Sequence, residues 1–244
     1  MSLPPILAFE ELDSTSAEAR RRASAGETGP VWITATRQTA GHGRRGRAWE
    51  TGTGNLAATL LFTTNKPAGE AAQVSFIAAL AVADLAAACL PAPLVSLKWP
   101  NDLLVAGRKA AGILVESGKR DAGDLWVAVG IGVNLATPPV AAERPAAAFS
   151  AHIDKAPAPL EALEVLREAF ERWLSLWNVS GFGRISQAWT ARAHGIGEAC
   201  VARLPNETVE GIAEGLDLDG ALRLRLPGGE VRRITAGDVF FGEV

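Results

Sequence analysis

An apolar run near the middle of the chain limits its fold more than any other feature. From Val74 to Leu90 the residues are mostly alanine and larger apolar side chains, interrupted by the polar residues Ser75 and Asp84. A helix that is apolar on every side must be covered on every side. The polar interruptions and the many alanines favour a buried helix of a soluble domain over a membrane span. We therefore expect a helix over residues 73–90 at the centre of a layered fold.

Segments rich in β-branched and aromatic residues lie on both sides of this helix. They predict strands, joined in one case by a turn at Ala106-Gly107, at residues 31–35, 56–62, 95–98, 109–116 and 126–133. Ser14 and Thr15 precede a helical pattern, which indicates a capped helix start. Apolar side chains from Leu160 to Trp177 recur at helical spacing, and a shorter helix is expected over 183–194. The proline-rich residues 137–159 predict an irregular connection.

The pattern of apolar and polar residues changes after Gly197. Short alternating runs are separated by the turn signals Asp217-Leu218-Asp219-Gly220 and Pro227-Gly228-Gly229, which are typical of β-hairpins. This part of the chain predicts a small antiparallel barrel. The expected fold class is α+β, with one domain over residues 1–195 and the barrel over residues 196–244.

Charge and cysteine content exclude several classes of protein. The net charge of −3 over 244 residues argues against a globally basic nucleic-acid binder. Cys89 and Cys200 lie far apart and form neither a disulfide framework nor a Cys/His zinc pattern. The N-terminus lacks the basic start of a signal peptide. We expect a cytoplasmic protein with no membrane partner.

The first segment that suggests chemistry is a loop rich in glycine and arginine. Residues 39–54 contain five glycines and three arginines, Arg44, Arg45 and Arg47. Glycines let backbone N–H groups approach an anion, and guanidinium groups bind phosphate bidentately. Such a loop can close over a nucleotide, although a solvated basic turn has the same composition. The GxxxxGK[ST] pattern of a Walker loop is absent from the sequence.

Two further segments place polar residues at the ends of predicted strands. Asn101 and Asp102 follow Pro100 and offer oxygen ligands suited to Mg²⁺ beside phosphates, and the same dipeptide is also typical of a turn. Asn134 ends the run Gly130-Ile131-Gly132-Val133-Asn134, whose glycines indicate either a close backbone approach or a bulge.

Lys109 begins the strand predicted at 109–116. Strict alternation places Lys109 and Ala111 on one face of that strand and Ala110 and Gly112 on the other. Its small neighbours leave room for a ligand beside the ammonium group, although a lysine on an edge strand also discourages aggregation.

In this order and spacing, the segments closely resemble the bacterial biotin–protein ligase family. The matching runs are QTAGHGRRGRAW at 38–49, KWPNDL at 98–103, RKAAGILVE at 108–116 and GIGVN at 130–134. The resemblance extends from Asp13 to the end of the chain. It implies a mixed-sheet catalytic domain of the biotin/lipoate ligase type and an SH3-like C-terminal barrel. It also implies that ATP and Mg²⁺ activate biotin, which is then attached to a lysine of a biotin carboxyl carrier protein.

Each matched residue takes a role from this resemblance. Lys109, Arg44 and Arg47 would be catalytic cations around the α-phosphate and the adenylate. Either Asn101 or Asp102 would hold Mg²⁺ or orient the acceptor lysine. The residues expected to contact biotin or the adenylate are Ser14, Thr15, Ser16, Gln38, Gly41, His42, Gly43, Arg44, Trp49, Lys109, Gly112 and Asn134.

Two positions depart from the family's pattern. His42 stands where the loop usually has arginine, and histidine is shorter and mostly neutral at pH 7. Ser16 stands where asparagine often follows the Ser-Thr pair. About a dozen residues precede Ser14, so we expect no N-terminal DNA-binding domain and no nucleic-acid partner. The sequence leaves open whether the protein is a monomer or a homodimer.

Two other functions are compatible with the same residues. A lipoate or octanoate ligase of the same superfamily would also place a lysine beside a carboxylic acid. A non-catalytic biotin-binding protein would keep the pocket without turnover, and His42 is the feature that supports it. The sequence contains no GxSxG elbow, as expected if the carboxylate of the substrate itself attacks ATP.

Overall fold

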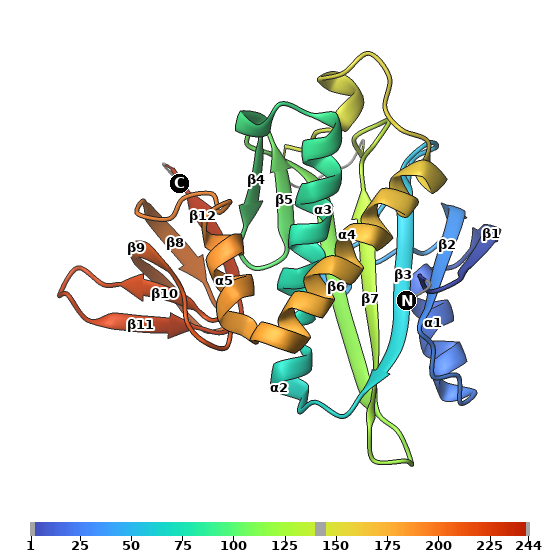
Figure 1. The fold of residues 1–244 in the computed structure, drawn as a ribbon. Helices are drawn as coiled ribbons and strands as arrows, with labels where there is room; N and C mark the ends of the chain where they lie inside the picture. The colour runs from blue at the N-terminus through green and yellow to red at the C-terminus, as the bar shows by residue number, and fades with distance from the viewer. Residues whose placement is uncertain (1–2, 140–144, 243–244) are drawn as a thin grey trace.

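The computed structural model describes residues 3–139 and 145–242, which form two β-sheets with helices packed around the larger one (Figure 1). The larger sheet has seven strands in the order β1-β2-β3-β7-β6-β5-β4. Its strands are β1 (Ile6–Leu12), β2 (Val31–Gln38), β3 (Leu56–Thr64), β4 (Val95–Lys98), β5 (Asp102–Val105), β6 (Arg108–Lys119) and β7 (Leu125–Val133). β1 runs parallel to β2 and every other neighbouring pair is antiparallel. The sheet is therefore mixed, as expected, although the sequence patterns did not predict β1 and β5.

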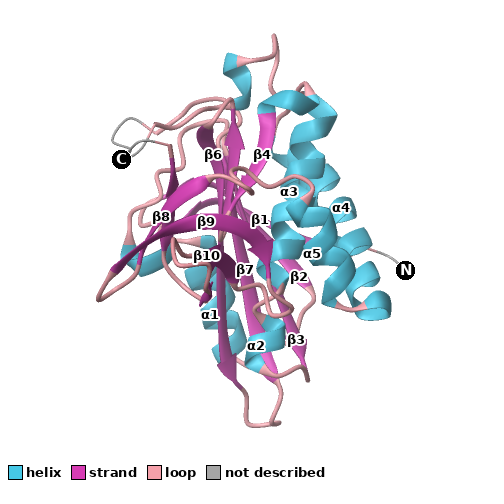
Figure 2. Ribbon diagram, turned by 90° about the vertical axis from the view of Figure 1, so that its left-hand side faces the viewer, coloured by secondary structure: helices cyan, strands magenta, loops and turns pink. Residues whose placement is uncertain are grey.

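Helices cover both faces of the larger sheet. Figure 2 shows the sheet between α1 on one side and α3 and α4 on the other. The helices are α1 (Thr15–Ser24), α2 (Ala68–Ala71), α3 (Val74–Cys89), α4 (Pro159–Ser180) and α5 (Phe182–Thr190), with short 3₁₀ turns at Arg44–Gly46, Ala92–Leu94 and Phe149–Ala151. Ser14 caps α1 by accepting a hydrogen bond from the backbone N–H of Ala17. The helix expected at 183–194 ends earlier, at Thr190.

The prediction of a central buried helix is confirmed. Nearly every side chain of α3 from Val74 to Ala86 is buried, and the helix packs on the sheet beside α4 (Figure 1). The stretch Ala68–Cys89 is long and apolar enough to span a membrane, yet 67% of its apolar window is buried inside the protein. Trp32 on β2 meets Phe170 on α4 edge to face at 5.7 Å, so α4 also contacts the sheet directly.

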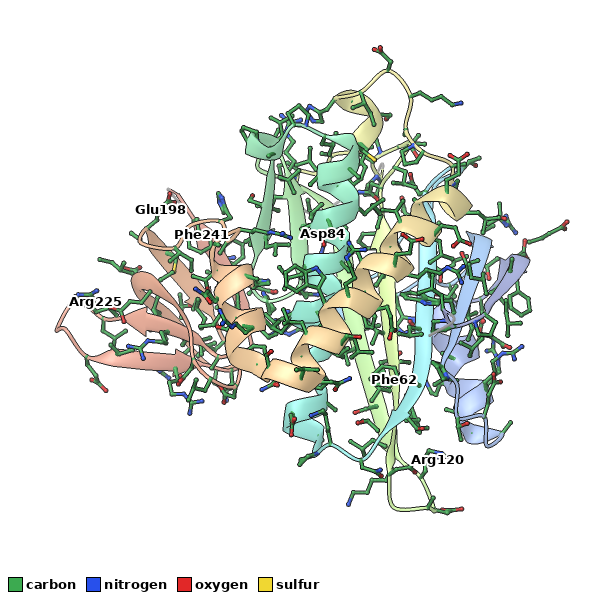
Figure 3. All side chains as sticks on the ribbon, viewed as in Figure 1. Phe62, Asp84, Arg120, Glu198, Arg225 and Phe241 are labelled. Atoms are coloured by element: carbon green, nitrogen blue, oxygen red, sulfur yellow. The ribbon has the colours of Figure 1, made fainter. Side chains whose placement is uncertain are left out.

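Asp84 is the charged residue of this apolar helix, and it joins three parts of the fold. Its carboxylate accepts hydrogen bonds from Trp173 Nε1 on α4 at 2.8 Å and from Arg192, just after α5, at 2.7 Å. Figure 3 labels it on α3, at the centre of the molecule. A partly buried carboxylate held by two donors fixes the position of the segment that leads into the second sheet.

The second sheet is antiparallel and follows α5 in the chain. Its five strands, in the order β11-β10-β9-β8-β12, are β8 (Ala199–Arg203), β9 (Thr208–Leu216), β10 (Leu222–Arg225), β11 (Val231–Ile234) and β12 (Asp238–Phe241). In the described residues β11 and β12 are not paired with each other, so the sheet is open where a closed barrel was expected. Figure 3 labels Glu198, Arg225 and Phe241 on this module.

Side chains from both parts fill the junction between the sheets. Trp99 is buried, and its indole N–H donates to the carbonyl of Gly220 at 3.1 Å. The ring of Phe241 packs edge to face on His194. The module following residue 195 is therefore held against the KWPND segment, which places it close to the site described next.

Candidate functional site

One cavity of about 300 Å³ opens on the face of the larger sheet that carries α1. A volume of this size lies at the lower end of the range for small-molecule sites. All the candidate residues expected from the sequence except Gly41 line it. Gly41 instead packs against its own loop, where an added Cβ would lie 2.5 Å from the carbonyl oxygen of Trp49. The structure thus gives Gly41 a packing role against Trp49 and Gln38, and its contact with a ligand stays a prediction.

Glycines on β6 and β7 form the floor of the cavity. Gly112 and Gly132 face each other across the strand pair, and the indole of Trp49 lies on both. An added Cβ would meet the Trp49 ring at 2.3 Å from Gly132 and at 3.1 Å from Gly112. Because these two glycines have no side chains, the indole of Trp49 can lie directly on the strands. This contact holds the glycine–arginine loop against the sheet, and the loop and the sheet together enclose the cavity.

Lys109 reaches the cavity because β6 contains a bulge. The pairing of β5 with β6 shifts register so that Ala110 has no partner: Leu104 pairs with Lys109 and Leu103 with Ala111. Strict alternation put Lys109 and Gly112 on opposite faces, and this prediction is wrong. With the extra residue both face the cavity, and an added Cβ on Gly112 would lie 3.3 Å from Lys109 Nζ. A bulge re-aims the side chain, as bulges next to active sites commonly do.

The Lys109 ammonium has a carboxylate as its partner. Lys109 Nζ lies 2.6 Å from Asp102 Oδ1, and both side chains line the cavity. The same ammonium lies 5.7 Å from the centre of the Trp49 ring, within the range of a cation–π interaction. The lysine is thereby held at the centre of the site by one acid and one aromatic face.

A chain of hydroxyl groups supports the wall of the cavity beside Gly130, where an added Cβ would lie 2.5 Å from Ser16 Oγ. Thr59 Oγ1 on β3 donates to Thr15 Oγ1 at 2.8 Å and lies 3.3 Å from Ser16 Oγ. Gln38 Oε1 accepts from both the backbone N–H and the hydroxyl of Thr15. Ser16, where the resemblance expects asparagine, is thus held in a buried hydrogen-bonded chain. The side chains present both donors and acceptors to a flat polar ligand.

The arginines of the loop are held from two directions. Arg44 donates to Asn101 Oδ1 at 3.1 Å and, more weakly, to the carbonyl of Gly237 at 3.4 Å. Arg45 and Arg47 both pair with Asp238, at 3.3 and 3.1 Å. Burial lowers the pKa of Arg44, and the charges of its two arginine neighbours act in the same direction. Arginine nevertheless stays protonated in proteins, so a dense cluster of positive charge faces the cavity.

Asn101 and Asp102 have different surroundings, although they are adjacent in sequence. The side chain of Asn101 accepts from Arg44, and its Nδ2 donates to the carbonyl of Ile113 at 2.6 Å. Both ends of the amide are therefore engaged, and Asn101 positions Arg44. Asp102 faces Lys109 instead. Among the described residues no three His, Cys, Asp or Glu side chains come together as a metal site.

His42 and Asn134 line the remaining walls. His42 Nε2 lies 3.9 Å from Glu116 Oε2, and the other oxygen of Glu116 accepts from Arg20. Asn134 is 2% exposed, and its amide donates to the carbonyl of Ala147 at 3.1 Å. Asn134 therefore fixes the segment at 145–148 beside the cavity, while its Oδ1 has no hydrogen-bond partner among the described residues.

Thr59, behind the cavity wall, and Asp238, in the wall itself, are polar residues that the sequence reasoning missed. Thr59 lies within an apolar strand of the kind that fills a core, and a single hydroxyl there gives no pattern to detect. Asp238 comes from the second sheet, some 190 residues from the loop that it pairs with. Neither could be found without the tertiary contacts.

Comparisons with known proteins agree with this arrangement. Residues 8–134 match the Biotin/lipoate A/B protein ligase family, and residues 195–242 match the Biotin protein ligase C terminal domain. A biotin–[acetyl-CoA-carboxylase] ligase of Paracoccus denitrificans is 46% identical over 236 residues, which cover 94% of this chain and 98% of that protein. The ligase of the same name from Mycobacterium tuberculosis is 32% identical and is covered over 85% of its length.

Solved structures share the fold. The biotin protein ligase of Aquifex aeolicus in complex with biotin and ATP superposes with a TM-score of 0.83 at 22% identity, covering 98% of this chain and 99% of that one. The Leishmania major enzyme in complex with biotinyl-5-AMP gives a TM-score of 0.66 at 25% identity, covering 96% and 100%. From these matches along almost its whole length, the chain belongs to the biotin protein ligase family.

Proposed function

We propose that this enzyme joins biotin to the α-phosphate of ATP and then transfers the biotinyl group to a lysine of a biotin carboxyl carrier protein. The observation that carries the proposal is the polarity of a single cavity. Hydroxyl and amide side chains line this cavity together with the cations Lys109, Arg44 and Arg47. Ser16 lies beside Gly130, whereas Lys109 lies beside the Gly112–Gly132 pair, two residues further along β7. Biotin has matching ends, because its ureido ring is neutral and polar and its valeryl chain ends in a carboxylate.

The neutral end of the ligand is assigned to the start of α1 and its neighbours. The hydroxyls of Thr15 and Ser16 and the amide of Gln38 supply donors and acceptors for the ureido group. Ser14 contributes by capping α1 and so fixes the backbone that presents them. The glycine floor and Trp49 supply the apolar surface for the rings of biotin and for the adenine.

The cationic end is assigned to the reacting phosphate. An oxygen of the biotin carboxylate attacks the α-phosphorus, the bond to the bridging oxygen of the β-phosphate breaks, and pyrophosphate leaves. Negative charge gathers around the phosphorus in the transition state. Lys109 and Arg44 are fixed by Asp102 and Asn101 before the substrate arrives, so stabilising that charge requires little reorganisation. Removing one such cation costs on the order of 10²–10³-fold in rate.

In the second half-reaction, the lysine amine of the carrier attacks the acyl carbon of the mixed anhydride. The bond between that carbon and the phosphate oxygen breaks, AMP leaves, and the amine loses a proton. The anhydride hydrolyses if water reaches it, and the glycine–arginine loop, with His42 and Gly43 in the cavity wall, excludes water. Asp102 is placed to orient the incoming amine, because its carboxylate already binds the ammonium of Lys109.

The residues present fit a nucleotide-bound Mg²⁺. This ion is usually held by substrate phosphates and one or two carboxylates, and Asp102 is a carboxylate in the cavity wall. Asn101 fits less well, since its amide oxygen already accepts from Arg44. When bound, the ion neutralises charge on the phosphates. Asp102 would assist the phosphates in holding it, a smaller role than its proposed orientation of the amine, and Lys109 would then turn towards the ligand.

The organisation of the protein follows the same proposal. We assign the catalytic domain to residues 1–195 and an SH3-like module to residues 196–244. Among the described residues of that module, β11 and β12 are not paired with each other. The enzyme acts in the cytoplasm, as a monomer or a homodimer.

Exchange of pyrophosphate into ATP tests the first half-reaction. Purified protein with Mg²⁺ is given biotin, lipoate or octanoate, and exchange is expected with biotin alone. Exchange with lipoate or octanoate would move the substrate to the other branch of the superfamily. Absence of exchange with all three acids would contradict an enzymatic function and support a non-catalytic binding protein.

A lysine pair gives the matched test of the site. Lys109→Ala is expected to abolish exchange while the fold stays intact, because the cation beside the phosphate is lost. Lys119→Ala removes an exposed lysine from the far end of the same strand and is expected to leave exchange unchanged. Near-normal turnover in the Lys109→Ala protein would contradict the assignment of Lys109 as the cation beside the α-phosphate.

A further inference from the structure

Three arginines of the glycine–arginine loop lie within four residues of one another, and their counter-charge comes from the other end of the chain. Arg45 and Arg47 pair with the carboxylate of Asp238, and both oxygens of Asp238 accept from Arg47 at 3.1 Å. Arg44 reaches the preceding carbonyl, that of Gly237. Gly237 and Asp238, at the start of β12, therefore contact all three arginines.

Asp238 differs from the other acids of the C-terminal module because its ion pairs reach outside that module, to Arg45 and Arg47. Its side chain is 18% exposed and lines the proposed substrate cavity, whereas the other ion pairs described for that module join its own residues, as between Glu207 and Arg232. Gly237 has φ +150°, and an added Cβ would lie 2.9 Å from the carbonyl oxygen of Arg203. A glycine is needed for the backbone to turn this closely, and the turn directs Asp238 at the loop.

Charge balance indicates what Asp238 does. Arg45 and Arg47 disfavour the charged form of Arg44, while Asp238 and Asp102 are the acids that favour it. Asp102 already pairs with Lys109. Without the Asp238 carboxylate, repulsion among the three guanidinium groups would be less compensated, and the loop would lose its ion pairs to the second sheet. Nucleotide phosphates can supply the same counter-charge, but only when the substrate is bound.

We propose that Asp238 is a positioning residue which holds the arginine loop over the cavity, and that the phosphates of the nucleotide replace it as partner of Arg45 and Arg47 when they bind. The inference rests on the proposed function, because it assigns the phosphates of ATP to that end of the cavity. It makes the C-terminal module part of nucleotide binding. Asp238 itself takes no part in bond making.

The test compares Asp238→Asn with Asp238→Glu and with a control from the same module. Asp238→Asn keeps the size and removes the charge, and Asp238→Glu restores the charge. Glu207→Gln removes a carboxylate that pairs with Arg232, away from the loop. Thermal unfolding of each full-length variant checks that it is folded.

Trypsin reports the state of the loop directly, since it cleaves after arginine. Cleavage after Arg44, Arg45 and Arg47, identified by mass spectrometry, is expected to be about tenfold faster in ligand-free Asp238→Asn, a typical size for a coupling between two sites. Biotin and ATP together should restore protection. Asp238→Glu and Glu207→Gln should be cleaved like the unchanged protein.

Pyrophosphate exchange gives the second readout. The KM for ATP is expected to rise about tenfold in Asp238→Asn, while kcat stays within about twofold and the KM for biotin at saturating ATP does not change. A protein damaged in a merely structural way would lose kcat as well. Cleavage and a KM for ATP equal to those of the unchanged protein would overturn the proposal. If no protein exchanges pyrophosphate, the proposed function fails, while the trypsin comparison still decides whether Asp238 holds the loop.

Discussion

Lys109 and Asp102 come from neighbouring strands, and their charged groups meet at 2.6 Å inside the cavity. The two residues are not cross-strand partners, because the bulge at Ala110 pairs Lys109 with Leu104 and Asp102 with Gly112. The extra residue brings the ammonium and the carboxylate to the same side of the sheet. The cation proposed to bind the phosphate and the acid proposed to orient the incoming amine are thereby held within one hydrogen-bond length of each other.

This arrangement predicts that Asp102→Asn separates the two half-reactions. The amide keeps the size of the side chain but cannot orient an ammonium by charge, while Lys109 remains to bind phosphate. Transfer from preformed biotinyl-AMP to the carrier is expected to fall about 10²-fold, the lower range for loss of an acid–base group, and pyrophosphate exchange is expected to fall far less. Both rates are measured in single-turnover assays.

Asp124→Asn is the matched control for Asp102→Asn. Asp124 pairs with Arg120 at the tip of the hairpin between β6 and β7 (Figure 3 labels Arg120), away from the cavity. The Asp124→Asn substitution should leave the rates of both half-reactions unchanged. Equal losses of exchange and transfer in Asp102→Asn would instead make Mg²⁺ binding in the first half-reaction the main role of Asp102.

Thr59→Val is expected to weaken the binding of biotin without affecting ATP. Valine has the shape of threonine but cannot donate to Thr15 or pair with Ser16, so two buried hydroxyls at the neutral end of the cavity lose a partner. We expect the KM for biotin to rise roughly tenfold, equivalent to about 1.4 kcal/mol. The free energy of unfolding should fall by about 1–3 kcal/mol, the cost of unsatisfied buried groups.

Thr59→Ser provides the control for that prediction, because it restores the hydroxyl and removes only a methyl group. It should return the KM for biotin close to its original value. A rise of the KM for ATP in Thr59→Val, or no rescue by serine, would argue against a specific role of the hydroxyl chain.

Gly132→Ala tests the glycine floor. Its added methyl group would lie 2.3 Å from the Trp49 ring, so the indole must leave its place over β6 and β7. Overpacking of this kind costs about 1–3 kcal/mol of stability, and loss of the aromatic plate should raise the KM of both substrates. Urea unfolding and pyrophosphate exchange measure the two effects. Gly69→Ala, at an exposed helix position with open space around it, should leave exchange unchanged.

Ala106→Asn is expected to stabilise the protein without changing its activity. Ala106 has φ +49° and Gly107 has φ +75° in the two-residue turn between β5 and β6, as in a type I′ hairpin turn. That conformation costs an alanine on the order of 1 kcal/mol, whereas Asn-Gly is the preferred pair. The midpoint of urea unfolding should rise with an unchanged m-value. An unchanged midpoint would contradict the strain argument.

The sequence by itself determined the elements whose signal is local. Continuous apolarity predicted α3, helical spacing predicted α4, and runs of β-formers predicted most strands of the mixed sheet. The order and spacing of the glycine–arginine loop, KWPND and Lys109 also identified the residues of the cavity, because each motif is contiguous in the chain. Local periodicity and short-range chemistry need no knowledge of distant neighbours, and for that reason they can be recognised in the sequence.

Only the tertiary structure decided how these residues meet. The bulge at Ala110 reverses which residues share a face with Lys109, and it arises from pairing with β5, a strand that showed no pattern of its own. Thr59 is fully buried and supports the cavity wall through its hydrogen bonds with Thr15 and Ser16 on α1, and Asp238 joins the arginine loop from a separate sheet. Strand register and the approach of distant segments are set by packing and charge across the whole chain. These contacts join residues that are far apart in the chain, so no short segment of the sequence could predict them.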